Sequence, residues 1–188
     1  MFAENKLKPA TGRLLIAEPF LHDDYFRRCV ILITEHNEKG TIGFILNKPL
    51  EVMVHEAVPE FPDYENPAFF GGPVQRDQLY FIHTSGALID ESVPVTKNIF
   101  WQGDFECVKS LIANKTISEK QIRFFIGYAG WEPGQLEREI EEKSWFVSKT
   151  DSELIFDVAP ALLWTTAVKK MGAAFAPMAN FPEDPTMN

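Results

Sequence analysis

The sequence predicts an α+β fold, a single domain in which short helices flank a largely antiparallel, strongly curved sheet. Two nearly continuous apolar runs, at 29–34 and 41–46, are separated by a polar turn that ends in Gly40. Further short apolar runs alternate irregularly with segments of helical periodicity, and the sequence contains no internal repeat. Runs of this length and spacing favour antiparallel strands over the regular alternation that builds a parallel α/β sheet.

The N-terminal part of the chain is predicted to form a strand and then a hairpin. RLLIA at 13–17 has the composition of a strand, and the runs 29–34 and 41–46 form the hairpin around the turn 35–40. Because the hairpin strands are apolar at nearly every position, both of their faces should be covered. We therefore expect these hairpin side chains to be buried: Ile31, Ile33, Phe44 and Leu46.

The middle of the chain is predicted to contain further strands around two helices. The expected elements are a helix at 51–58, a proline-rich loop at 59–67, strands at 68–70 and 78–83 around the turn Gly71–Val74, and a strand at 122–128. Asp104 is expected to cap a helix in which Phe105, Val108 and Leu111 recur at helical spacing. Ser118–Gln121 has the spacing of a capping box just before the strand at 122–128.

The C-terminal part begins at a glycine-rich turn, 127–134, in which Gly130 is predicted to adopt a positive φ. The expected elements that follow are a helix at 135–143, strands at 145–148 and 154–156, and a final helix at 158–171 that Gly172 ends. In the helix at 135–143, Leu136 and Ile140 face inward, so the glutamates are expected to form a solvated face rather than a metal site. The last residues, 176–188, are expected to be poorly ordered unless they dock.

Charge and composition exclude several classes of function. Across 188 residues the chain has 18 basic and 27 acidic side chains, a net charge of −9, and neither half is basic. Nucleic-acid binding depends on clustered Lys and Arg, so the charge argues against direct nucleic-acid contact. No apolar stretch is long enough to cross a membrane and the first twelve residues lack an apolar signal core, so we expect a cytoplasmic protein.

Motifs of the common enzyme classes are absent from the sequence. It contains no GxxxxGK[ST], GxGxxG, GxSxG or HExxH, and its four histidines are scattered without metal-ligand spacing. We therefore assign no catalytic residue, no metal and no cofactor. Cys29 and Cys107 are interpreted as small buried hydrophobes, with a disulfide or a reactive thiol as the alternatives.

The candidate ligand or partner site consists of two glycine motifs and a histidine. Glycines allow a ligand to approach the backbone, Trp131 offers a flat apolar wall, and His83 ends an apolar strand with a polar group. The candidate residues are Gly71, Gly72, Pro73, Val74, His83, Gly127, Tyr128, Gly130 and Trp131. The alternative is that these residues only form turns and pack, and for the turn 127–134 a structural role is favoured over anion binding because Glu137 would face the anion.

Several segments resemble the YqgE/AlgH family of bacterial proteins. These are GRLLIAEPFLHDDYF (12–26), GFILNKP (43–49), GGPV (71–74), LYFIH (79–83) and GYAGWEPGQLEREI (127–140). The sequence departs from the family pattern at Lys48, where Arg is common, and at Cys29, where Ser is common. The resemblance implies an α+β fold whose sheet is bent into a barrel-like shape, but it implies no established reaction, cofactor or catalytic set.

Together these observations predict a domain at 12–172, preceded by an N-terminal extension, 1–11, and followed by a C-terminal tail, 173–188. The family is labelled as regulators of transcription, so the first hypothesis is a non-catalytic regulatory or binding protein that acts indirectly, through a protein or small-molecule partner. One alternative is an enzyme with its site near the two glycine motifs, since catalytic groups converge in space rather than in sequence. The other is a regulator that binds DNA directly, against which the charge argues.

Overall fold

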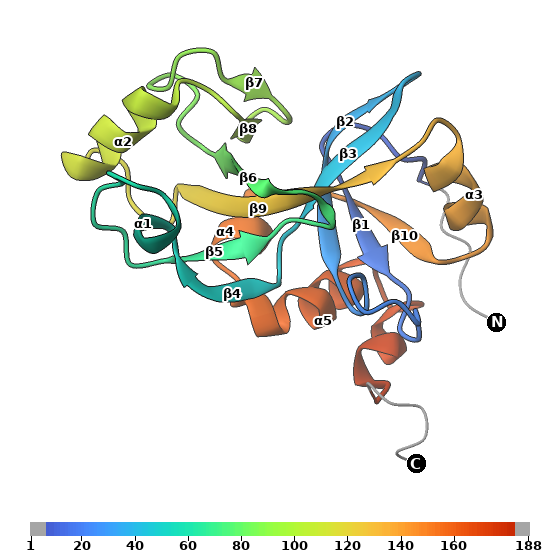
Figure 1. Ribbon diagram of the computed structural model, residues 1–188. Coiled ribbons are helices and arrows are strands. Elements are labelled where there is room, and N and C mark those ends of the chain that lie inside the picture. The colour runs from blue at the N-terminus through green and yellow to red at the C-terminus, as the bar shows by residue number, and fades with distance from the viewer. Residues whose placement is uncertain (1–6, 183–188) are drawn as a thin grey trace.

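The computed structural model describes residues 7–182, and one long strand, β9 (Ile122–Trp131), runs through the whole molecule. Figure 1 shows strands gathered around each end of β9. Around its C-terminal end lie β1 (Arg13–Ala17), β2 (Val30–Asn37), β3 (Gly40–Ile45) and β10 (Trp145–Lys149). Around its N-terminal end lie β4 (Pro49–Met53), β5 (Pro67–Phe70), β6 (Val74–His83), β7 (Val93–Pro94) and β8 (Phe100–Trp101).

The strand order is β10-β1-β2-β3-β9-β6-β8-β7, with β4 and β5 off this path. Every pairing is antiparallel except that of β5 with β9, so the predicted α+β class and antiparallel sheet are confirmed. The expectation of a strongly curved, barrel-like sheet was wrong, because the sheet is open: its end strands, β10 and β7, do not pair with each other. The helix α5 (Pro160–Lys170) packs against β1 and β2 instead, so a helix covers apolar surface that closure would have buried.

The predicted hairpin is formed by β2 and β3, with Leu32 opposite Phe44. Ile31, Ile33, Phe44 and Leu46 are all fully buried, as the sequence predicted. The reason for this burial is that β2 and β3 lie in the interior of the sheet, between β1 and β9.

Most predicted helices form where expected, but two short segments differ. The carboxylate of Asp104 accepts hydrogen bonds from the backbone N–H groups of Glu106 and Cys107 and so begins α2 (Phe105–Ala113). The predicted helix at 51–58 is wrong in its first half, where the chain is the strand β4 paired with β5, and only α1 (Val54–Ala57) is helical. The segment 154–156, expected as a strand, lies in the helix α4 (Ser152–Phe156), whose first turn Asp151 caps.

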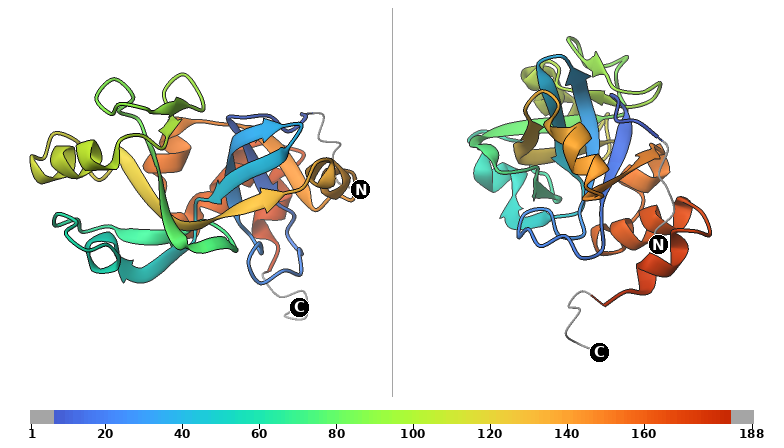
Figure 2. Two further views of the ribbon diagram at one scale, coloured as in Figure 1. Left: turned by 45° about the horizontal axis from the view of Figure 1, so that its top comes forward. Right: turned by 90° about the vertical axis from the view of Figure 1, so that its right-hand side faces the viewer.

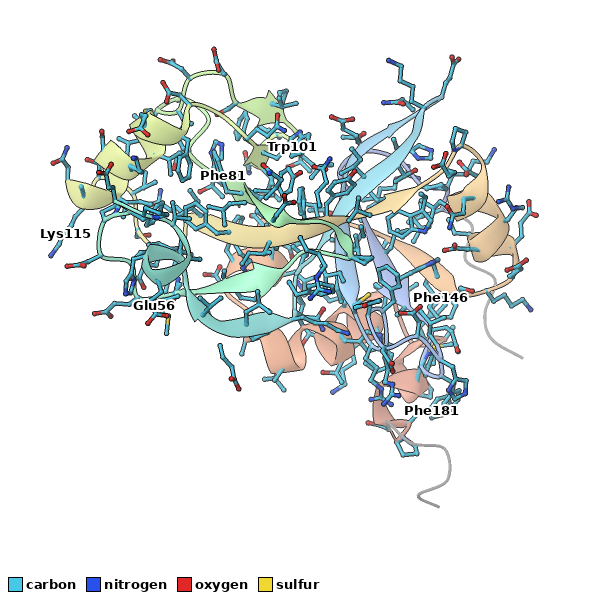
Figure 3. The ribbon with its side chains drawn as sticks, in the orientation of Figure 1. Glu56, Phe81, Trp101, Lys115, Phe146 and Phe181 are labelled. Atoms are coloured by element: carbon cyan, nitrogen blue, oxygen red, sulfur yellow. The ribbon has the colours of Figure 1, made fainter. Side chains whose placement is uncertain are left out.

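Three hydrophobic clusters fill the structure, and β9 contributes to all of them. Phe124 points into a cluster under α2, whereas the next residue, Phe125, points to the opposite face and stacks on Phe44 at 5.0 Å between ring centroids. The third cluster surrounds Trp131 at the C-terminal end of the strand. Figure 3 shows Phe81 above the N-terminal half of β9 and Phe146 beside β10, on the other side of the molecule.

The C-terminal region docks on the sheet after α5 ends before Gly172, which has a positive φ of 109°. The 3-10 helix η1 (Ala176–Asn180) packs against α5. Phe175, which precedes η1, and Met178, which lies within it, are both buried, so the described part of the predicted tail is ordered. Figure 2 shows this region beside the blue N-terminal strands. Residues 1–6 of the predicted extension and 183–188 of the tail lie outside the described residues. Within 7–182, no helix combines the length and hydropathy that crossing a membrane requires.

Candidate functional site

The two glycine motifs meet where one segment of the chain crosses over another. The backbone N–H of Gly71 donates to the carbonyl of Ile126 on the edge of β9 that pairs with β5. Val74 is already paired with Tyr128 as part of β6, which lies on the opposite edge. The residues between them, Gly72 and Pro73, therefore cross the face of β9.

This crossing explains why three of the predicted site residues are glycines. A Cβ at Gly71 would overlap the carbonyl oxygen of Gly127, and a Cβ at Gly72 would overlap the backbone of Tyr128. Gly127 has a positive φ of 71°, and a Cβ there would overlap the carbonyl oxygen of Gly72. At this point the glycines let two segments of backbone approach each other, which is a structural role.

Gly130 differs from these glycines. The prediction that it has a positive φ was wrong: the positive φ values in this turn belong to Gly127 and Gly134, and Gly130 continues the strand β9 opposite Ile42 of β3. A Cβ at Gly130 would meet only the ring edge of Tyr128, at 3.1 Å, and more distant side-chain atoms. The missing side chain therefore leaves a hollow on the surface of the sheet.

The hollow is the floor of a groove of about 490 Å³. The turn between β2 and β3 forms one wall, and the start of β6 and the turn before α3 (Gln135–Glu141) form the other. The lining residues are Glu35, Asn37, Lys39, Gly40, Thr41, Ile42, Val74, Tyr128, Gly130, Trp131, Glu132 and Gln135. Four predicted site residues, Val74, Tyr128, Gly130 and Trp131, thus line one groove.

The groove combines an aromatic and aliphatic floor with an acidic rim. The ring of Tyr128 packs edge-on against Tyr80, with 5.8 Å between ring centroids, and burial raises the pKa of Tyr80. Ile42 and Val74 add aliphatic surface, and the charged residues of the lining are two carboxylates, Glu35 and Glu132, and one lysine, Lys39. Such a lining suits a ligand with an apolar body and a group that donates hydrogen bonds or carries positive charge.

The ring of Trp131 does not form the apolar wall that was predicted for the site, because its side chain points to the other face of the sheet. Successive residues of a strand alternate in direction, and Trp131 is buried with Ala129 rather than lying beside Tyr128. Its indole N–H donates to Glu139 at 2.8 Å, and the indole of Trp145 donates to the same carboxylate oxygen, also at 2.8 Å. The ring fixes the end of β9 against α3.

Glu139 was predicted to lie on a solvated face of the helix, and this prediction was wrong. The residue is partly buried and receives a further hydrogen bond from Gln135, at 2.9 Å. A signal was present in the sequence, because buried tryptophans need an acceptor for the indole N–H and two of them flank this short acidic helix. The remaining helix carboxylates, such as Glu137, are exposed as expected.

His83 lies at the opposite end of β6 and does not join the glycine motifs. It pairs with Ile122 at the start of β9, whereas Val74 pairs with Tyr128 near the strand's far end. Its Nδ1 accepts a hydrogen bond from the backbone N–H of Ser85, so Nε2 carries the proton and donates to the carbonyl of Gln102 at 2.9 Å. Both ring nitrogens are occupied, which leaves no free base.

The surroundings of His83 support a structural role. The side chain is fully buried and stacks on Phe100, and this burial lowers the pKa of the imidazole below its ordinary value. Ser92 lies 3.2 Å from Nε2, but its hydroxyl donates to the carbonyl of Ile89. The pair is therefore not arranged as a nucleophile and a base.

Metal and thiol chemistry find little support within residues 7–182. In this part of the chain, no group of three or more His, Cys, Asp or Glu side chains is placed to hold a metal ion. Cys29 and Cys107 are both free, so the disulfide alternative was wrong. Burial raises the pKa of the Cys29 thiol far above its ordinary value, which removes its reactivity.

Comparison with known proteins supports the resemblance noted in the sequence. The AlgH-like family model matches residues 14–176. A UPF0301 protein of Chlorobaculum tepidum is 46% identical over 182 residues, which cover 97% of this chain and 96% of that protein. A UPF0301 protein of Bacteroides thetaiotaomicron is 38% identical, covering 98% and 94% of the two chains.

Solved structures agree with the sequence comparison. The solution structure of AlgH from Pseudomonas aeruginosa superposes with a TM-score of 0.73 at 27% identity, over 95% of this chain and 98% of that one. A crystal structure of a protein from Corynebacterium diphtheriae gives a TM-score of 0.80 at 25% identity, over 95% of both chains. From the family match, the close relatives and the shared fold, we conclude that this chain belongs to the AlgH-like family.

Proposed function

We propose that this chain is a non-catalytic binding protein whose ligand lies in the groove over Gly130. The observation that carries the proposal is the groove itself: four residues singled out from the sequence line one hollow of about 490 Å³, a size typical of small-molecule sites. The aromatic floor and the two rim carboxylates favour a small organic cation, such as an amine with an apolar body. In a regulator, binding of this kind would alter contacts with a further protein.

Neither alternative function gains support from the geometry. Direct DNA binding would require a basic surface, and the net charge of −9 together with the acidic rim of the groove opposes phosphate contacts. An enzyme would require a nucleophile with a base or an activated water, but the ring nitrogens of His83 are occupied and the Cys29 thiol is buried. We therefore propose binding without catalysis.

The test uses NMR titration of the ¹⁵N-labelled full-length chain with three amines: phenethylamine, tyramine and agmatine. We expect at least one of them to produce saturable shifts in the backbone amides of Ile42, Gly130 and Glu132. Phenethyl alcohol, which keeps the ring but lacks the charge, should bind more weakly. The control variant is Gly130→Val, whose side chain fills the groove and should abolish the shifts.

Two results would overturn the proposal. The first is the absence of saturable shifts at the groove with all three amines, which would favour a protein as the partner. The second is equal binding of an amine to the wild type and to Gly130→Val, which would place the amine outside the groove.

A further inference from the structure

A second cavity, of about 500 Å³, lies at the other end of β9. It is lined by the start of β9, by β4 and β5, and by the connection from α4 to α5. The lining residues are Pro49, Tyr64, Asn66, Pro67, Phe69, Glu119, Lys120, Ile122, Arg123, Phe156, Asp157, Val158, Ala159 and Pro160. None of the residues predicted from the sequence as a candidate site lines this cavity.

The notable side chain in this cavity is Arg123. Its guanidinium carbon lies 4.5 Å from the ring centroid of Phe69 and 6.0 Å from that of Phe156, so aromatic rings hold the group in place. One terminal nitrogen, Nη1, donates to the carbonyl of Leu46 at 2.9 Å. Burial lowers the pKa of Arg123 to about 10, which leaves the guanidinium charged at neutral pH.

This charge has no counterion among residues 7–182. No carboxylate in this part of the chain lies within 4.0 Å of Arg123, and its one hydrogen bond to a protein group is the one to Leu46. A guanidinium has five N–H donors, so most of them are free to meet a ligand. Removing a cation from water without pairing it is costly, and a bound anion would offset that cost.

The shape of the guanidinium indicates that the bound anion is a carboxylate. Its planar donors match the two oxygens of a carboxylate, with two parallel hydrogen bonds. Around it, Phe69, Phe156 and Pro160 provide an apolar surface suited to the body of an organic acid. The helix α5 begins at this cavity without a side-chain cap, and the dipole at its N-terminus adds a favourable potential for an anion.

The rim of the cavity favours a single negative charge. Lys120 supplies a second cation, but Glu119 and Asp157 supply two carboxylates, so the four charged lining groups carry no net charge. A dianion such as phosphate would meet repulsion from both carboxylates, whereas a monoanion can be paired by Arg123 alone.

We propose that the cavity beside Arg123 binds the carboxylate of a small organic monoanion whose apolar body packs between Phe69, Phe156 and Pro160. This site is separate from the groove over Gly130 and takes a ligand of the opposite charge. It is an anion site within a protein of net negative charge, which a cation held between aromatic rings makes possible.

Titration with benzoate tests the proposal, using the full-length chain and the side-chain Nε–Hε resonance of Arg123 as the probe. Benzoate should shift this resonance saturably, and benzamide, which is neutral and of the same shape, should not. Arg123→Lys keeps the charge but loses the planar arrangement of donors, so benzoate should bind at least about tenfold more weakly. Binding to this variant is measured by the shift of the backbone amide of Phe156. Asp157→Asn, at an exposed residue, should tighten binding about threefold by removing a like charge.

Several results would overturn the proposal. Equal shifts with benzoate and benzamide would show that the charge is not recognised. Tighter binding of inorganic phosphate than of benzoate would exclude a monocarboxylate site. If Arg123→Lys folds and binds benzoate as the wild type does, Arg123 is not the anion's partner. If Asp157→Asn leaves the affinity unchanged, the anion does not lie near the rim carboxylates as the cavity lining requires. Gly130→Val, which fills the other site, should leave benzoate binding intact, so the two proposals fail independently.

Discussion

Gly127 and Gly130 lie three positions apart on β9, yet glycine serves a different purpose at each. At Gly127 the space of a side chain is filled by the backbone of the crossing segment, since the Gly72 carbonyl oxygen lies 2.4 Å from where a Cβ would be. At Gly130 the same space faces the groove, with only the ring edge of Tyr128 nearby. A glycine motif therefore marks either a crossing or a binding surface, and its spatial neighbours decide which.

The comparison predicts a large loss of stability at the crossing. Gly127→Ala combines an unfavourable positive φ with overlap against the Gly72 carbonyl, and a backbone atom cannot rotate away. We expect the free energy of unfolding to fall by about 3 kcal/mol or more, since strain and overpacking each cost about 1–3 kcal/mol. Urea denaturation followed by circular dichroism would measure it.

Gly134→Ala separates the two contributions to this loss. Gly134 has a similar positive φ, 75°, but a Cβ there would lie 3.7 Å from the nearest atom, the flexible guanidinium of Arg138. This variant should therefore lose only about 1 kcal/mol, the contribution of φ alone. Equal losses in Gly127→Ala and Gly134→Ala would show that the crossing imposes no steric restriction.

A smaller loss is expected where Glu139 holds the groove end of β9. Glu139→Ala would leave the indole N–H groups of Trp131 and Trp145 without their shared acceptor. Each unpaired buried donor costs at least about 1 kcal/mol, so for the two indoles together we expect a loss of about 2 kcal/mol. The matched control is Glu137→Ala on the same helix, at an exposed side chain, which should change stability by less than about 0.5 kcal/mol. Similar losses in the two variants would contradict this role of Glu139.

The sequence predicted the fold best where neighbouring segments interact. The hairpin of β2 and β3 forms between adjacent runs, and the cap at Asp104 involves residues within one turn, so local patterns suffice for both. The segments at 51–53 and 154–156 were assigned incorrectly because each is only a few residues long, and pairing with β5 or capping by Asp151 outweighs weak propensity.

The candidate site could be predicted only in part, because its geometry depends on distant pairings. Two glycine motifs more than fifty positions apart do lie together, and the glycines themselves indicated close approach of the backbone. His83 was grouped with them because it ends the strand predicted to follow the turn Gly71–Val74. In the structure that strand, β6, is ten residues long, and its length separates His83 from Val74. Arg123 gave no signal, since the rings that hold it come from β5 and α4.

His83, at the end of β6 away from the crossing, should make the stability of the fold depend on pH. Burial lowers the pKa of His83 in the folded state below its ordinary value of 6.5, so the unfolded chain binds the proton more readily. The stability contributed by neutral His83 is present above pH 6.5 and decreases as the pH falls below it. Unfolding free energies at pH 7.5 and 5.5 should therefore differ more in the wild type than in His83→Gln. The other histidines are common to both proteins, and equal differences would show that His83 does not contribute.

The smallest effect on stability is expected at Gly130, and it gives the sharpest contrast with Gly127. Gly130→Val places a β-branched residue in an extended strand, where valine is favoured, and the ring of Tyr128 can move to admit it. The free energy of unfolding should stay within about 0.5 kcal/mol of the wild type. The same variant should lose amine binding, because its side chain occupies the hollow. The two variants should thus differ in stability. Gly127→Ala should unfold at a lower urea concentration than the wild type, whereas Gly130→Val should be as stable as the wild type but bind no amine, because the valine side chain fills the groove. A loss of about 2 kcal/mol or more in Gly130→Val would mean that packing requires this glycine, as it does Gly127. The glycine would then be explained by the fold and not by ligand binding.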